Sequence, residues 1–190
     1  MVGDEKQYMN MSVIRFETKP FKIGDSTILR LPQAVSAELP SRGMVLVEGT
    51  ISGFQFRTPL EPDGTGSHWL KLDKALLVGS KARTGDSVRV ELVPSKDWPE
   101  PDLPADLTAA LAADPTANAV WRDITPMARW DWLRWIRATN NPETRTNHVA
   151  VALSKMKNGT RRPCCFNRSM STDFSVSKNG VLRMPQEMVI

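Results

Sequence analysis

The N-terminal half of the fold is decided by residues 44–60, MVLVEGTISGFQFRTPL. This stretch predicts two strands joined at Ser52-Gly53, because apolar and polar side chains alternate on both sides of that pair. Phe54 and Phe56, for example, fall on one face of the second strand. We therefore expect an antiparallel hairpin with one buried face.

Further short strands are predicted on both sides of this hairpin. They are SVIRFETK (12–19), STILRLP (26–32), HWLKL (68–72) and SVRVELV (87–93). The segment DKALLVGS (73–80) is short and reaches a glycine, so it predicts no more than one helical turn. Five or six short strands with one small helix predict a small β-barrel over residues 13–96.

The chain changes character after a proline-rich seam, Pro94 to Pro104, where neither a helix nor a β-ladder runs easily. Beyond the seam, residues 102–163 carry repeated helix-start signals. These are Asp102 or Pro104, Asp114-Pro115, Thr125-Pro126 and Asn141-Pro142. Gly159 is placed to end the last helix. We expect three or four helices and an α+β fold class, a β-barrel followed by a helical bundle. Two separate domains and one shared core both fit this pattern.

The two ends of the chain give weaker signals. We expect residues 1–12 to be a disordered N-terminus and residues 164–190 to be a C-terminal extension. Within the extension, Asn179-Gly180 lies between two short apolar runs and predicts a small β-hairpin.

Composition narrows the class of protein. The 190 residues are 41% hydrophobic and 24% charged, with 25 basic and 21 acidic residues and a net charge of +4. This is globular composition, and no apolar run is long enough to span a membrane. No secretion signal is visible in the first residues, so we expect a cytoplasmic protein. Two adjacent cysteines and two histidines leave little material for a metal site, and we expect neither a metal nor a cofactor.

A run of basic residues after the last predicted helix is the best candidate for a binding site. Its members are Lys155, Lys157, Arg161, Arg162 and Arg168, with no acid between them. Such a run predicts a contact surface for an anionic partner, nucleic acid or another anion. The alternative is a solvated face whose cations complement the helix dipole.

Cys164 and Cys165 are the second candidate site. Arg161 and Arg162 precede Cys164 and would favour its thiolate, and His148 is the possible base of a cysteine–histidine pair. Buried structural thiols are the competing interpretation. His68 beside Trp69, after the glycine-containing loop EPDGTGSH, is interpreted as a structural histidine.

Four tryptophans lie within fifteen residues: Trp121, Trp130, Trp132 and Trp135. On a helix these residues cover a wide apolar arc. We interpret them as the core of a small helical unit, with Trp130 and Trp135 as members of it. The alternative is an aromatic platform for stacking bases or a peptide.

Three motifs point to a known family. They are V-x-G-T-I-x-G (Val47 to Gly53), P-x-D-L-x-x-A-L (Pro104 to Leu111) and W-I-R-A-T…P-E-T-R (Trp135 to Arg145). Over residues 13–163 the chain resembles a bacterial and archaeal family of unknown function. The resemblance implies a double-split β-barrel, as in AbrB-like regulators, followed by a YdeI/OmpD-associated, or bacteriocin-protection, helical module. It implies no catalytic residues.

The functional expectation is a binding or regulatory module rather than an enzyme. No paired-carboxylate, Ser-His-Asp or glycine-rich cofactor arrangement is present in the sequence. The alternatives are a stress or antimicrobial-peptide tolerance protein that acts through protein–protein contacts, and a cysteine-dependent enzyme or redox sensor.

Overall fold

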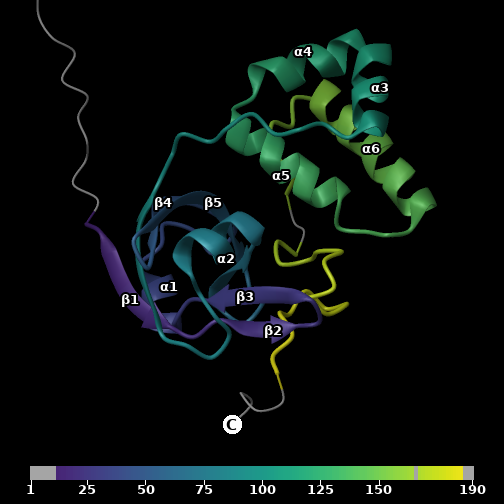
Figure 1. The fold of residues 1–190 in the computed structure, drawn as a ribbon. Helices are drawn as coiled ribbons and strands as arrows, with labels where there is room; N and C mark the ends of the chain where they lie inside the picture. Colours follow the sequence, from purple (N-terminus) through teal and green to yellow (C-terminus); the bar gives the residue numbers. More distant parts are fainter. Residues whose placement is uncertain (1–11, 165–166, 186–190) are drawn as a thin grey trace, which may run out of the picture. The chain divides into compact units, whose positions relative to one another are not determined.

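The computed structural model describes residues 12–164 and 167–185 (Figure 1). The expected disordered segment 1–12 therefore lies outside the described residues, except for its last residue. Tertiary contacts group the chain into two compact units. Among the described residues, the first unit holds 12–62, 66–96 and 185, and the second holds 63–65, 97–164 and 167–184. Each unit is described by itself.

The first unit contains a seven-stranded antiparallel sheet with the order β1-β7-β4-β5-β6-β3-β2. The strands are β1 (Ile14–Thr18), β2 (Phe21–Ile23), β3 (Ser26–Arg30), β4 (Val45–Ile51), β5 (Phe54–Pro62), β6 (His68–Leu72) and β7 (Val88–Pro94). Two short helices accompany them, α1 (Gln33–Ala37) and α2 (Lys74–Ser80).

The sheet curls into a half-barrel (Figure 1). Its longest strand, β5, pairs with β4 as far as Leu60 and then with β6 from Glu61 onward. The two edge strands, β1 and β2, are consecutive in the chain and are separated only by Lys19 and Pro20. Because two residues cannot cross a flat seven-stranded sheet, the sheet must bend back on itself. The α+β class is thus confirmed, and its β part is a curled sheet.

The predicted hairpin is confirmed as β4 and β5. Ser52 (φ 49°) and Gly53 (φ 85°) both adopt the left-handed conformation that a two-residue hairpin turn requires. Val45, Leu46 and Val47 are all buried, so the first half of β4 is covered on both faces. This explains why the strict alternation expected there does not hold.

Within the described residues of the first unit, the structure has one more strand and one more helix than the sequence predicted. Strand β2 was missed because three residues show no readable period, and it exists only by pairing with β3. Helix α1 was also missed. Helix α2 is longer than the single turn expected, because the Asp73 carboxylate accepts a hydrogen bond from the Leu76 amide at 2.8 Å and caps it.

The second unit contains four helices. They are α3 (Ala105–Ala113), α4 (Pro115–Asp123), α5 (Pro126–Ile136) and α6 (Pro142–Lys157). Asp114, Thr125 and Asn141 cap the last three, each accepting a hydrogen bond from a backbone amide in the first turn, and a proline follows each cap. Gly159 (φ 84°) ends α6 in the left-handed conformation, as predicted.

The tryptophans contribute unequally to the core of this unit. Trp132 is fully buried and Trp121 is 5% exposed. Trp135 is partly buried and packs against the same apolar cluster. Trp130 is outside the cluster, donating its indole N–H to the Pro99 carbonyl at 2.8 Å and lying 6.0 Å from the Trp98 ring centre. The prediction that Trp130 belongs to the core is therefore wrong, and Trp132 is the central residue.

The C-terminal extension forms a tight turn rather than a regular hairpin. Val176 and Leu182 make a single antiparallel bridge, and Gly180 (φ 78°) occupies the turn. The Ser177 amide donates to the Val181 carbonyl at 2.8 Å. The predicted turn is present, and the bridge does not extend into strands in the described part of the extension.

Candidate functional site

The five residues of the basic run do not form a uniform cationic patch. Lys157 pairs with Asp114 at 2.7 Å, and Arg161 pairs with Asp123 at 2.7 Å. Arg162 donates its Nε–H to Asp131 Oδ2 at 2.8 Å. Lys155 and Arg168 are exposed, and no ion pair of theirs is found among the described residues. Three of the five charges are therefore compensated inside the second unit.

The carboxylates that pair with the run come from the preceding helices. Asp114 and Asp123 belong to α4 or its cap, and Asp131 belongs to α5. The hydrogen bond from Lys157 holds the pKa of Asp114 below its ordinary value. Helix packing thus brings carboxylates from earlier in the chain against the basic run.

The cysteine–histidine candidate is only partly described. Cys164 is a free, exposed cysteine, and Cys165 lies outside the described residues. His148 stacks on Trp135 with ring centres 4.4 Å apart and planes 15° apart. Its Nδ1 is buried and has no hydrogen-bond partner in the described structure, and no hydrogen bond joins it to Cys164 there. The nucleophile hypothesis stays a prediction.

His68 is a structural residue of the first unit, as its position beside Trp69 suggested. It is 1% exposed, and its Nε2 lies 2.7 Å from the Gly43 carbonyl. A carbonyl only accepts, so Nε2 carries the proton and Nδ1 accepts from the Ser36 hydroxyl at 2.6 Å. Both ring nitrogens are thereby satisfied, and the side chain ties α1 to β6 out of reach of a ligand.

A groove on the surface of the second unit is a better candidate site. Its volume is about 420 Å³, within the range of small-ligand pockets. Apolar side chains line it, namely Leu103, Leu111, Ala112 and Trp121. Asn118 and Arg122 add an amide and a guanidinium. The groove is open to solvent, since Leu103, Ala112 and Arg122 are exposed.

Helix spacing explains how these residues meet. Thr108, Leu111 and Ala112 of α3 stand at i, i+3 and i+4, and so share one face of that helix. Asn118, Trp121 and Arg122 of α4 have the same spacing. The sequence shows each trio as an ordinary helix face, so nothing in it indicated that the two faces border one groove.

Arg129 of α5 fixes one end of the groove. Its Nε–H donates to the Trp121 carbonyl and its Nη2 to the Arg122 carbonyl, both at 2.8 Å. Its Nη1 is paired with Glu100. All three nitrogens of Arg129 are engaged, and its charge is compensated. In the part of the chain that the structure describes, by contrast, the side chains of Asn118 and Arg122 make no hydrogen bond or ion pair.

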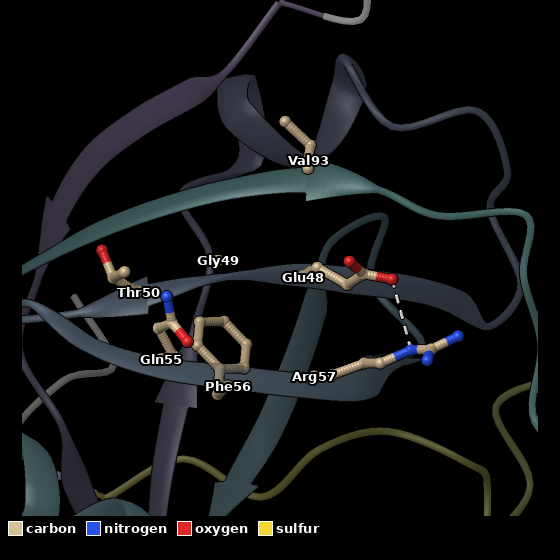
Figure 2. A pocket seen from close by; sticks show the side chains of 7 residues that line it. All are labelled: Glu48, Gly49, Thr50, Gln55, Phe56, Arg57 and Val93. Carbon is tan, nitrogen blue, oxygen red and sulfur yellow. Dashed lines mark ion pairs between the residues drawn. The ribbon is translucent and has the colours of Figure 1, made fainter. Parts of the chain in front are cut away.

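A second hollow, of about 540 Å³, lies on the outer face of β4, β5 and β7 (Figure 2). Glu48 and Arg57 face each other across neighbouring strands there, with Glu48 Oε1 3.3 Å from Arg57 Nε. Thr50 and Gln55 form the next cross-strand pair on that face. Because its acid and base neutralise each other, this hollow carries no net charge to attract a ligand.

Two family models match the chain. Residues 12–92 match a domain of unknown function, DUF1905. Residues 100–159 match the family described as bacteriocin-protection, YdeI or OmpD-associated. None of the curated proteins matches the chain. The YdeI/OmpD-associated part of the resemblance is thereby confirmed.

The groove on the second unit lies wholly within the YdeI/OmpD-associated region, from Leu103 to Arg129. No group of three or more potential metal ligands is found among residues 12–164 and 167–185. None of the helices described is long and apolar enough to cross a bilayer.

Proposed function

We propose that this protein is a binding protein whose YdeI/OmpD-associated unit receives a peptide segment in the groove between α3 and α4. The observation that carries the proposal is the composition of that groove. An apolar floor of Leu111 and Trp121 lies beside two polar side chains, Asn118 and Arg122, that make no hydrogen bond or ion pair within the described chain. Apolar anchors combined with a few polar groups are typical of recognition sites.

The family description supports a peptide as the partner. Bacteriocins are peptides or proteins, so a bacteriocin-protection unit with a peptide-sized groove suits a role in tolerance to antimicrobial peptides through protein–peptide contact. We propose that this role is exercised in the cytoplasm. We also propose that the DUF1905 region is a double-split barrel of the AbrB-like kind, since its sheet already curls and its edge strands are consecutive.

Binding is favoured over catalysis by the dispersal of reactive groups. Ser36 and His68 satisfy each other inside the first unit. His148 stacks on an indole. In the described chain none of these residues lines the groove, which an acid or base would need to do to act on a bound ligand.

A matched pair of substitutions on α3 tests the proposal. Ala112 lines the groove, whereas Ala109 is an exposed alanine of the same helix that does not. Ala112→Trp fills the groove, whereas Ala109→Trp adds the same apolar area, with the same helix propensity, at a position that does not line the groove. A random peptide library would be selected on the wild-type protein and then scored against both variants. We expect binders that are lost with Ala112→Trp and kept with Ala109→Trp; a library without such binders would overturn the proposal.

Contact with an anionic partner through the basic run is a second candidate function. The observation that favours it is Lys155, which is exposed and has no ion pair among the described residues. Lys157, Arg161 and Arg162 would have to exchange their carboxylate partners for phosphates. That exchange makes the run a weaker candidate than the groove.

A further inference from the structure

We infer that the groove between α3 and α4 recognises the C-terminal carboxylate of a peptide whose last side chains are apolar. The inference rests on the proposed function and names the chemical class of its partner. It follows from three observations. Arg122 is an uncompensated charge in the groove, Asn118 is a hydrogen-bond donor beside it, and both lie next to the apolar floor.

Arg122 is the uncompensated charge. The neighbouring arginines are engaged: Arg129 pairs with Glu100, Arg161 with Asp123 and Arg162 with Asp131. Arg122 is exposed, lines the groove and forms no ion pair or side-chain hydrogen bond in the described chain. The groove therefore carries one net positive charge, which one carboxylate would neutralise.

Asn118 supplies a second donor beside that charge. It precedes Arg122 by four residues on α4, so the two side chains are neighbours on the helix surface. A guanidinium binds a carboxylate through two parallel N–H···O bonds, and an amide N–H can reach a remaining lone pair. The pair thus offers the donors that a carboxylate accepts, and Arg122 offers no acceptor for a cationic group.

The apolar floor favours the C-terminal residue of a peptide over an aspartate or glutamate within the peptide. Trp121 precedes Arg122 directly, and Leu111 lines the same groove, so the anion site and the apolar site adjoin. A C-terminal residue carries its carboxylate and its side chain on one Cα, which matches this short separation. Because the rim is open to solvent, the rest of the peptide can leave the groove without being buried.

The test uses a defined probe and the full-length protein. The probe is the peptide Gly-Ser-Gly-Ala-Leu-Leu, labelled with fluorescein at its N-terminus and made with a free C-terminal carboxylate or a C-terminal amide. Fluorescence anisotropy gives the two dissociation constants. We expect the free acid to bind about tenfold more tightly than the amide, because hydrogen bonds from a guanidinium to an ionised carboxylate are stronger than those to a neutral amide. Arg122→Gln should abolish this preference, and Arg122→Lys should retain part of it.

Lys178→Gln is the matched control, since it removes one exposed cation of the same unit that belongs neither to the groove nor to the basic run. It should leave the preference for the free acid unchanged. Ala112→Trp should weaken both peptides together. Circular dichroism checks that every variant is folded.

Three results would overturn the inference. In the first, the free acid and the amide bind equally well and Ala112→Trp weakens both. The groove would then bind peptides without recognising the C-terminal carboxylate, and the proposed function would stand. Lys155→Gln, and not Arg122→Gln, could remove the preference, which would move the anion site to the basic run. Decanoate could displace the probe with higher affinity than the unlabelled peptide, which would make a lipid-like acid the occupant. If neither peptide binds and the library yields no binder sensitive to Ala112→Trp, the proposed function fails as well.

Discussion

Arg145 of α6 forms a bidentate salt bridge with Asp106 in the first turn of α3. Its Nε and Nη2 donate to the two carboxylate oxygens at 2.7 and 3.0 Å. The two residues are 39 positions apart in the chain, so this contact joins the first and last helices of the second unit. Hydrogen bonds from Arg145 hold the pKa of Asp106 below its ordinary value of 3.8, against a smaller opposing effect of burial.

This pair predicts a pH-dependent contribution to stability. Because the folded-state pKa of Asp106 is depressed, the contribution is complete above the unfolded-state pKa of about 4 and is lost as pH falls through the folded-state pKa. Both side chains are partly exposed, so we expect a coupling energy of about 1 kcal/mol or less. A double-mutant cycle with Asp106→Asn and Arg145→Gln, measured by urea unfolding, should give that coupling at pH 7 and a smaller one at pH 3. A coupling that grew on acidification would contradict the assignment.

Trp132 should be the most sensitive tryptophan of the second unit. It is fully buried in the apolar cluster, whereas Trp130 is only partly buried and lies outside it. We expect Trp132→Ala to cost about 3–5 kcal/mol of unfolding free energy, from the lost transfer energy and the cavity left behind. Trp130→Ala should cost clearly less, since it removes one indole hydrogen bond and part of the packing on Trp98. Urea unfolding followed by circular dichroism compares them, and equal losses would show that Trp130 is a core residue after all.

Gly49 should tolerate no side chain. It pairs with Leu92 across β4 and β7, and a Cβ placed on it would collide with the backbone carbonyl of Glu91. Gly49→Ala therefore forces two neighbouring strands apart, and we expect a loss of about 3 kcal/mol or more. The matched control is Gly53→Asn in the hairpin turn, where φ is positive but no atom lies in the way. Asparagine accepts that conformation, so the control should cost about 1 kcal/mol or less. A mild effect of Gly49→Ala on the urea midpoint would contradict the close approach.

The ion pairs of the basic run predict how it would respond to nucleic acid. Asp123→Asn with Asp131→Asn releases Arg161 and Arg162 from their carboxylate partners. If the run contacts phosphates, the double variant should bind random-sequence DNA more tightly than the wild-type protein. Its affinity should also fall more steeply with salt, by about 0.9 in the logarithmic slope for each added phosphate contact.

Fluorescence anisotropy at several salt concentrations measures this, and Arg161→Gln with Arg162→Gln is the counterpart that should lower the slope. Absence of DNA binding by both the wild-type protein and the double variant at low salt would remove nucleic acid as a partner. Loss of Arg161 also removes its hydrogen bond to the Asp123 carbonyl, so the folded state of each variant must be confirmed by circular dichroism.

Features that depend on neighbouring residues in the chain could be predicted from the sequence. The starts of α4, α5 and α6 follow from a capping side chain and a proline, because the hydrogen bond that begins each helix spans only three residues. The Ser52-Gly53 turn follows in the same way from two residues that accept a positive φ. The YdeI/OmpD-associated region was likewise visible as local motifs.

Only the tertiary structure decided which charges remain available and where a groove opens. Arg161, Arg162 and Lys157 looked like one cationic face, but their partners lie 31 to 43 residues away on other helices, as Asp114 does for Lys157. Nothing in the sequence distinguishes Arg122 from the other arginines, yet helix packing places it on the groove without a carboxylate partner in the described chain. The physical reason is that helical spacing determines which side chains share one face of a helix, whereas the face they meet depends on how separate helices pack around Trp132.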